Sequence, residues 1–415
     1  MLKKQTQRKL ALYFSAMIFL NGFLVWRSEH GITIGLSDFS IFYTAGKILR
    51  DGRGHQLYDL NLQETVQRAA VPGAVGERRG AILPYNHPAF EGYAFLPLAF
   101  FPYRTAYLIW FSINIGFLAA VIAMLRQHLP CIGQVPLYLW VMGCLAFTPL
   151  IITLVQGQDS IALLFFYCMA FISLRQKAEF SAGAWIAAGL VRFQLSLPFI
   201  VPFLLIKRWR MLAGFCISGM ILVWIALRVV GWAGVANYPA YVWNLEHRPK
   251  FHWIASSAGM PNLHGLISAL LPQTRPGIMA SLLLITSLIL LFASSFGVRT
   301  IFKGAQKDVY LPFAANLITS VLISYHTWLH DLTILFLAVL LVLENFASGP
   351  LLPPSRIRTL GLLCIFLLWS PLDIILLHLQ SLEILAIVLI VLLGTILIEN
   401  RHQPPEPGCI AEALN

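Results

Sequence analysis

Long apolar runs alternate along almost the whole 415-residue chain with short segments that are rich in charge, proline or glycine. A helix that crosses a membrane needs about 20 consecutive apolar residues, and runs bounded in this way are typical of such helices. The pattern predicts crossings near residues 10–26, 105–125, 136–155, 159–174, 211–230, 277–298, 309–324, 331–346, 358–371 and 381–398. We therefore expect an all-α polytopic membrane protein with about 10–12 transmembrane or half-membrane helices.

The stretch 182–206 differs from the other apolar runs because Arg192 and Pro198 interrupt it. A single crossing would put the basic cluster at 207–210 on the opposite side of the membrane from Arg175. Two short half-helices that enter the membrane and return would keep both on one side. Broken helices of this kind are tolerated at membrane depth where they line a protein cavity.

Composition agrees with a membrane protein. Hydrophobic residues make up 58% of the chain and charged residues only 11%, whereas soluble domains have about 45–50% apolar and about 25% charged residues. The six cysteines lie in apolar spans or short connections, so neither a disulfide framework nor a CxxC metal site is predicted. P-loop, GxGxxG and GxSxG motifs are absent from the sequence, which argues against a nucleotide-driven enzyme or an ABC transporter.

Positive charge predicts the orientation. The net charge of +11 comes from 29 Lys+Arg against 18 Asp+Glu, and with the returning half-helices most basic residues gather in loops on one side. The turns 156–158 and 325–330 on the other side contain no Lys or Arg. Because cytoplasmic loops carry the excess of positive charge, we expect both termini in the cytoplasm and the protein in the cytoplasmic (inner) membrane. This arrangement explains the basic composition without nucleic-acid binding.

The same pattern divides the chain into six parts. A basic end followed by an apolar core resembles a signal peptide, but no small-residue cleavage site follows, so we expect a retained first helix. The expected parts are a cytoplasmic tail and first transmembrane helix at 1–26, an extracytoplasmic loop at 27–91, a transmembrane bundle at 92–230, a second extracytoplasmic loop at 231–276, a C-terminal bundle at 277–398 and a cytoplasmic tail at 399–415. The chemistry is expected on the side of the two extracytoplasmic loops.

The first long loop is predicted to contain an amphipathic helix. Ser37 can cap a helix through DFSIFYTAGKILRD, and Gly52 can end it. Its predicted polar stripe consists of Ser40, Thr44, Lys47 and Asp51. Asp59 can cap a second short helix, and residues 71–80, rich in Pro and Gly, are expected to form a flexible connection.

Two charged residues are candidates for chemistry because their surroundings are apolar. Asp38 lies in the first turn of the predicted helix but off its polar stripe, so its carboxylate either faces a polar cleft or only assists capping. Arg192 lies inside an apolar stretch, and a cation within the membrane is a functional-site hypothesis. It is expected to pair with a protein carboxylate or with a ligand phosphate, and a structural ion pair is the alternative.

Two outer turns add further candidates. In SYHTWLHD, His326 and His330 are four residues apart and would share a face if the segment were helical. A third ligand and an HExxH glutamate are missing, so contact with a phosphate or a sugar is favoured over a metal site. In QGQDS, Gln158 can hydrogen bond to a sugar, and Asp159 is expected to cap the following helix. The cations and aromatic residues at 243–253 suit a sugar phosphate or lipid headgroups equally well.

Four segments together resemble glycosyltransferase family 87, a group of membrane enzymes with the GT-C fold that use polyprenyl-phosphate sugars as donors. They are SDFSIFYTAGKILRDGRGHQLYD at 37–59, YNHPAFEGYAFLPLAFFP at 85–102, QGQDSIALLFF at 156–166 and AGAWIAAGLVRFQLSLPFIVPFLLIKRWR at 182–210. The resemblance implies that Asp38 is the catalytic base and that Arg192 contacts the donor phosphate. The chain departs from the family at His87-Pro88-Ala89, where relatives usually have a second proline.

The expected function is an inverting transfer of a hexosyl unit, mannose among the candidates, from a polyprenyl-phosphate donor to a lipid or glycan acceptor. Asp38 would act as the base, and the residues expected to bind the donor phosphate or sugar are Arg192, His326, His330, Lys47 and Gln158. Membrane lipids are expected to surround the protein, and neither a metal, another cofactor nor nucleic acid is predicted to take part. The alternative is a transporter or flippase of lipid-linked sugars, in which Asp38 only caps its helix.

Overall fold

The computed structural model describes residues 3–78, 81–246, 259–272, 275–300, 309–348 and 356–401, and these residues form helices, turns and loops without a strand. The helices in the first half are α1 (Lys4–Ile34), α2 (Phe39–Arg50), α3 (Leu60–Ala70), α4 (Pro72–Glu77), α5 (Gly92–Phe95), α6 (Tyr103–His128), α7 (Leu137–Ala146), α8 (Thr148–Gln156), α9 (Ser160–Arg175), α10 (Glu179–Ala188), α11 (Phe193–Leu205) and α12 (Trp209–Glu246). Those in the second half are α14 (Leu263–Leu270), α15 (Pro276–Thr300), α16 (Tyr310–Ile323), α17 (Leu335–Ser348), α18 (Arg356–Leu368), α19 (Leu372–His378) and α20 (Ile384–Arg401). Short 3₁₀ turns include η2 (Ala89–Glu91), η5 (Gly189–Arg192) and η8 (Leu329–Ile334).

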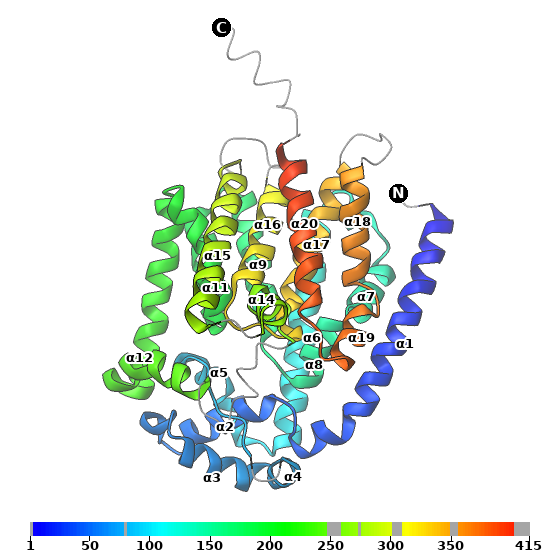
Figure 1. Ribbon diagram of the computed structural model, residues 1–415. Helices are drawn as coiled ribbons and strands as arrows, with labels where there is room; N and C mark the ends of the chain where they lie inside the picture. The colour runs from blue at the N-terminus through cyan, green and yellow to red at the C-terminus, as the bar shows by residue number, and fades with distance from the viewer. Residues whose placement is uncertain are drawn as a thin grey trace.

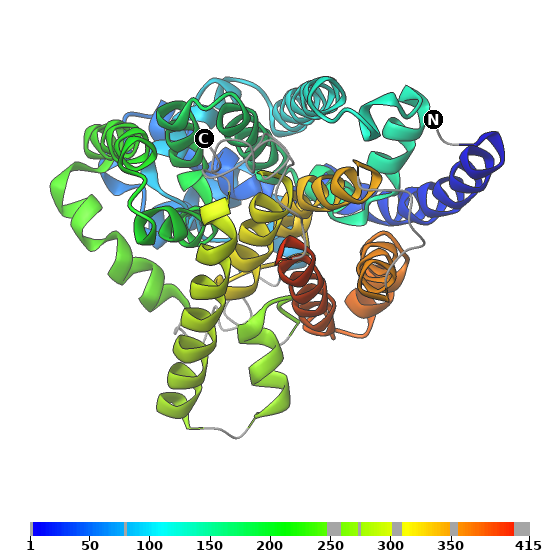
Figure 2. The same cartoon turned by 90° about the horizontal axis from the view of Figure 1, so that it is seen from above.

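The helices form a bundle with a cap at one end. Figure 1 shows the long helices running side by side, with α2, α3, α4 and α5 gathered beneath them. The start of α1 and the end of α20 lie at the other end of the bundle. Viewed along the bundle in Figure 2, α1 lies at the edge of the molecule, where it packs against α7 and α8. The cap therefore lies at the end of the bundle that is opposite to the start of the chain.

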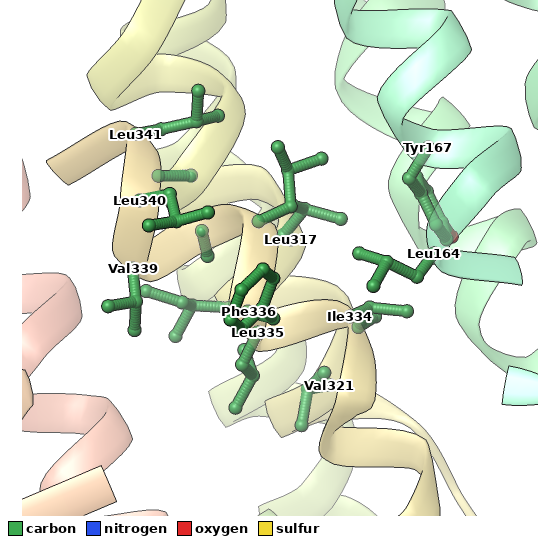
Figure 3. Close-up of a cluster of buried hydrophobic side chains, with 14 of the residues drawn as sticks. Leu164, Tyr167, Leu317, Val321, Ile334, Leu335, Phe336, Val339, Leu340 and Leu341 are labelled. Carbon is green, nitrogen blue, oxygen red and sulfur yellow. The ribbon is translucent and has the colours of Figure 1, made fainter. Parts of the chain in front are cut away.

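The two helices at the centre of the bundle, α16 and α17, are surrounded by apolar contacts. Nearly every side chain of α16 and α17 is buried, because other helices surround both. Figure 3 shows part of this core, in which Leu317 and Val321 of α16 pack near Phe336 of α17 and Leu164 of α9. Large apolar side chains also cover the outside, for example Leu12, Phe19 and Trp232, each more than 70% exposed. An apolar exterior around an apolar core is the arrangement that a lipid bilayer requires.

The helices account for the predicted crossings. Six described helices are long and apolar enough to cross a membrane, or up to eight if each of two bent pairs is one span. The bent pairs are α7 with α8, at 67°, and α18 with α19, at 53°. Three shorter apolar helices, α9, α16 and α20, coincide with further predicted crossings. The chain is thus an all-α polytopic membrane protein.

The segment α10–η5–α11 reverses direction within the bundle. By length and composition the range Glu179–Leu205 counts as one of the six spans. However, Arg208, just after α11, forms an ion pair with Glu179 at the start of α10. A continuous helix would separate these residues by about 1.5 Å per residue over 29 residues, so the chain must turn back. The turn is η5, which carries Arg192 at its tip.

Several local expectations about the first loop are wrong. Helix α2 is buried on nearly all sides, including Ser40 and Thr44 of the predicted polar stripe, because α3, α5 and residues 97–100 pack around it. The Ser37 hydroxyl bonds to the hydroxyl of Tyr103 at 2.8 Å instead of capping α2. The predicted flexible connection contains helix α4, which begins at a proline and buries Ala74 and Val75. Asp59 does cap α3, as expected, by accepting from the backbone N–H of residue 61.

Two helices extend beyond their predicted ends. Helix α1 continues past residue 26 to Ile34, where Gly35 ends it with a left-handed φ of 92°. Helix α12 continues past residue 230 to Glu246 with a kink at Gly231 (φ 70°), and its last part reaches the first loop, since Tyr241 donates to the carbonyl of Tyr85. The predicted ends lie at a charge, Arg27, in α1 and at a glycine, Gly231, in α12, but both helices have a protein surface to follow beyond these residues. Of the predicted cluster at 243–253, the residues from 247 onward lie outside the described residues.

Candidate active site

A cavity of about 280 Å³ opens between the cap and the bundle. Its wall includes the start of α2, the loop before η2, the turn between α8 and α9, the tip at η5, the segment before η8 and the region around α19. The polar or charged residues in this wall are Asp38, Asn86, His87, Gln156, Gln158, Arg192, His326 and His330. The apolar ones include Ile41, Ile152, Leu377 and Leu382. The cavity thus combines a polar side with an apolar side.

Asp38 precedes α2 but does not cap it, because its side chain makes no bond to the helix N-terminus. Instead, Oδ2 of Asp38 accepts a hydrogen bond of 2.7 Å from Nε2 of Gln158. The residue is half-buried, and Oδ1 accepts no hydrogen bond from the described part of the chain. The sequence left open whether the Asp38 carboxylate faces a polar cleft or only assists capping, and in the structure it faces a polar cavity.

Arg192 binds protein carboxylates at the tip of the reversing segment. Its Nη2 and Nε lie 2.7 and 2.8 Å from Oδ1 of Asp159, and Nη2 also donates to Oε1 of Gln158. Asp331 is farther away, with its Oδ1 3.8 Å from Nε. Arg192 is only 6% exposed, so its charge is balanced by buried carboxylates, and the guanidinium still forms part of the cavity wall.

Gln158 connects the two charged candidates. Its amide donates to Asp38 and accepts from Arg192, so one side chain fixes both groups in the same wall. Gly157 places it there with a left-handed φ of 64°, and a Cβ at that glycine would lie 2.7 Å from the Cβ of Phe39. Asp159, which the sequence assigned to helix capping, makes no side-chain cap bond and pairs with Arg192 instead.

The two histidines of the SYHTWLHD segment both line the cavity, although they do not share a helical face. Residues 324–328 are not helical, and η8 begins only at Leu329. Nε2 of His326 accepts a hydrogen bond of 2.7 Å from the indole N–H of Trp328. Nδ1 of His330 lies 2.9 Å from Oε1 of Gln156. Burial lowers the pKa of His326 to about 4, so this ring is neutral near pH 7.

One predicted residue lies elsewhere. Lys47 is two turns along α2 from the cavity, with its ammonium 5.5 Å from the ring centre of Tyr43, and it does not line the cavity. The structure therefore does not bring it to Asp38 and Arg192. The predicted polar stripe had grouped Lys47 with Ser40, Thr44 and Asp51, whereas Ser40 and Thr44 are buried and only the end of the stripe with Lys47 and Asp51 reaches the surface.

The sequence missed a buried group behind the wall. His87, Glu91 and Asp159 are all less than 7% exposed, and one ligand atom from each lies within 4.8 Å of the others. Burial and the positive charge of Arg192 lower the pKa of His87 to about 3, while burial and the charge of Asp159 raise that of Glu91. The signal was the spacing His-x-x-x-Glu at 87–91, directly before η2.

Comparison with known protein families matches residues 85–329 to glycosyltransferase family 87. The match spans more than half of the chain. The chain belongs to glycosyltransferase family 87. It is therefore a membrane glycosyltransferase, which decides against the transporter alternative.

No curated protein and no solved structure matches the chain, so the family alone gives the class of reaction. The range that matches family 87 includes Gln158, Arg192 and His326. Asp38 and Lys47 lie before it, and His330 lies one residue beyond it. The contact between Asp38 and Gln158 links the part of the cavity outside the matched range to the part inside it.

Proposed function

We propose that the protein transfers a hexosyl unit, with inversion, from a polyprenyl-phosphate sugar to a hydroxyl of a lipid or glycan acceptor. The observation that carries this proposal is the pairing of Asp38 and Arg192 through Gln158 in one cavity wall. Glycosyl transfer needs a base for the acceptor and positive charge for the leaving phosphate. The two groups supply these functions side by side.

Asp38 is suited to act as the base. Its Oδ2 is held by Gln158, which leaves Oδ1 to accept the proton of the acceptor hydroxyl as the hydroxyl oxygen attacks the anomeric carbon. The new carbon–oxygen bond forms on the face opposite to the breaking bond to phosphate, so a single displacement inverts the anomeric centre. A carboxylate on a fixed helix end is positioned for such a step before the substrate arrives.

Arg192 is suited to stabilise the leaving group. As the bond to the sugar breaks, the polyprenyl phosphate gains a negative charge, and a guanidinium already oriented by Asp159 can meet it without reorganisation. His326, which is neutral, and His330 both line the cavity and supply ring nitrogens for the sugar hydroxyls or the phosphate. The apolar wall at Ile152, Leu377 and Leu382 suits the first isoprene units of the donor. Lys47 has no part in this proposal.

The orientation is part of the proposal. Arg208 pairs with Glu179, and Arg175 donates to the carbonyl of His128, so these basic residues gather where α9 and α11 end and where α10 and α12 begin. The cavity is lined by the start of α2 and by the turn between α8 and α9, next to the cap that Figure 1 shows at the end of the bundle opposite to the start of α1. By the positive-inside rule, the cavity faces the extracytoplasmic side of the cytoplasmic membrane, and both termini are cytoplasmic.

A donor competition tests this proposal. The full-length protein in lipid nanodiscs, supplied with a bacterial lipid extract as the acceptor source, is given labelled mannose either on polyprenyl phosphate or on a nucleoside diphosphate. We expect label in the acceptor fraction from the polyprenyl-phosphate donor alone, with an inverted anomeric centre. Repeating the assay with other hexoses identifies the sugar. Transfer from the nucleotide sugar, or a retained anomeric configuration, would contradict the proposal.

A further inference from the structure

Among the described residues, the region behind the cavity wall contains more buried carboxyl groups than buried basic side chains. Asp159, Glu91 and Asp331 are each at most 4% exposed, and all three attract the guanidinium of Arg192 electrostatically. One guanidinium balances one of the three carboxylates. A buried carboxylate without a counter-charge costs several kcal/mol, so the group requires either bound protons or a cation. A divalent ion would neutralise the two remaining charges.

The carboxyl oxygens of Glu91 and Asp159 lie within hydrogen-bonding reach of each other, but no N–H group of the described residues donates to the oxygens that face this space. Both carboxylate oxygens of Glu91 and Oδ2 of Asp159 are buried and have no hydrogen-bond partner among the described residues. Nδ1 of His87 lies 2.9 Å from Oε2 of Glu91, but the angles are not those of a hydrogen bond, since Glu91 has no such partner. One ring nitrogen and two carboxylate oxygens thus point toward a common space. Buried polar atoms that are left unpaired in this way need an explanation.

The backbone holds these ligands independently of a substrate. His87 and Glu91 are four residues apart across Pro88 and the 3₁₀ turn η2 (Ala89–Glu91), which brings both side chains to one side. The ring of His87 packs 4.8 Å from the ring of Phe42 on α2, centre to centre. Asp159 is held from the other direction by Arg192. A preformed site of this kind loses little entropy when an ion binds.

We propose that His87, Glu91 and Asp159 bind one divalent first-row cation, of the class of Mn²⁺ or Zn²⁺, behind the cavity wall. One imidazole and two carboxylates form a ligand set that suits these ions. The cation holds Asp159, which in turn orients Arg192, and its charge raises the positive potential of the cavity. Glu91 and Asp159 do not line the cavity, and of the three ligands His87 alone does. The site therefore acts on the substrate through Arg192, and its ligands are positioning residues. The site does not depend on which sugar or acceptor the protein uses.

The site is tested with Mn²⁺ as the probe. The full-length protein in detergent is stripped with a chelator and titrated with Mn²⁺ alone, and bound ion is counted by electron paramagnetic resonance. We expect about one tightly bound Mn²⁺ per chain, with a nitrogen coupling from one imidazole in the pulsed spectrum. This coupling reports ligation in the unaltered chain, so it remains decisive even if a variant folds poorly.

Substitutions then assign the ligands. Glu91→Gln and His87→Gln are each expected to weaken Mn²⁺ binding by at least about tenfold, and His87→Gln should abolish the nitrogen coupling. The matched control is Glu344→Gln, which alters another fully buried carboxylate, one that accepts from the backbone N–H of Ile132. This control should bind Mn²⁺ like the wild type.

Three results would overturn the proposal. The first is wild-type protein without tight Mn²⁺ or Zn²⁺. The second is Glu91→Gln that binds the ion as well as the wild type does. The third is an infrared band of a protonated carboxylic acid that disappears in Glu91→Gln, which would mean that a proton occupies the place of the cation.

Discussion

Replacing Gln158 by Glu isolates the contact that orients Asp38. The side chain keeps its shape and can still accept from Arg192 through one oxygen. It can no longer donate to Oδ2 of Asp38, because an ionised carboxylate has no N–H, and two like charges would then face each other across 2.7 Å. The Gln158→Glu change therefore removes the support of the proposed base and leaves the contact with the phosphate-binding residue in place.

The size of the effect follows from this geometry. Gln158 is only 3% exposed, so water cannot readily replace the lost donor. A hydrogen bond to a charged group contributes about 1.5–3 kcal/mol, which corresponds to a rate that is lower by about 10- to 150-fold. Protonation of the introduced carboxyl at low pH restores a donor to Asp38. We therefore expect the loss of activity to be larger at high pH than at low pH.

The assay is transfer of labelled sugar from the polyprenyl-phosphate donor, measured as kcat and KM over a range of pH. The control is Gln176→Glu, the same change at the exposed turn that follows the other end of α9, which should transfer sugar at the wild-type rate. A Gln158→Glu protein that keeps the wild-type kcat, or that loses activity equally at every pH, would refute the reasoning.

Substitutions at three other residues have defined outcomes. Arg192→Ala leaves Asp159 buried without its partner, so the thermal midpoint in detergent should fall by the equivalent of about 3–5 kcal/mol. Arg192→Lys should keep the fold but transfer sugar at least about tenfold more slowly, because lysine lacks the planar, forked guanidinium group. Gly183→Ala places a Cβ against the carbonyl oxygen of Met211, so it should loosen α10 from α12 and lower the thermal midpoint; an unchanged midpoint would mean that the helices can separate freely. His326 has a pKa of about 4 in the folded chain and about 6.5 when unfolded. The stability that its neutral ring contributes is therefore present above about pH 6.5 and is lost as the pH falls toward 4. Between about pH 7.5 and about pH 5.5, the free energy of unfolding of His326→Gln should fall by about 1 kcal/mol less than that of the wild type.

Hydropathy and charge predicted the bundle because every helix that crosses a bilayer needs a long run of apolar residues. Predicted apolar runs coincide with the long helices α6 and α15 and with the shorter helices α9 and α16, whose apolar side chains face outward or pack on other helices and need no polar face. The returning segment also left a signal in the sequence, since a cation and a proline interrupted its apolar run. Charge at the two ends of that run mattered as much as hydropathy.

The cap was harder to predict because its helices obey tertiary packing rather than a solvent boundary. Helix α2 has an amphipathic sequence, yet Thr44 is buried and its hydroxyl donates to the carbonyl of Ser40. Such a self-satisfied threonine looks the same in sequence as an exposed one. Lys47, which was expected to bind the donor, lies toward the C-terminal end of α2 and does not line the cavity.

The site could be predicted in part, where charge is unusual for its surroundings. Asp38 and Arg192 were found in this way, and both line the cavity together with Gln158 and the two histidines. His87 and Glu91 were missed because their significance depends on Asp159, about 70 residues farther along the chain. Only the fold brings such residues together, and a local pattern of His and Glu does not reveal it.

The most direct test compares sugar transfer and donor binding in wild-type protein and in Asp38→Asn. The asparagine keeps the shape and can retain a contact with Gln158, but it cannot accept a proton from the acceptor. We predict that Asp38→Asn binds the polyprenyl-phosphate sugar with nearly unchanged affinity and transfers it at least about 100-fold more slowly, the lower end of what a general base contributes. The control Asp51→Asn, at the exposed end of α2, should be fully active. Normal transfer by Asp38→Asn would contradict the assignment of Asp38 as the base.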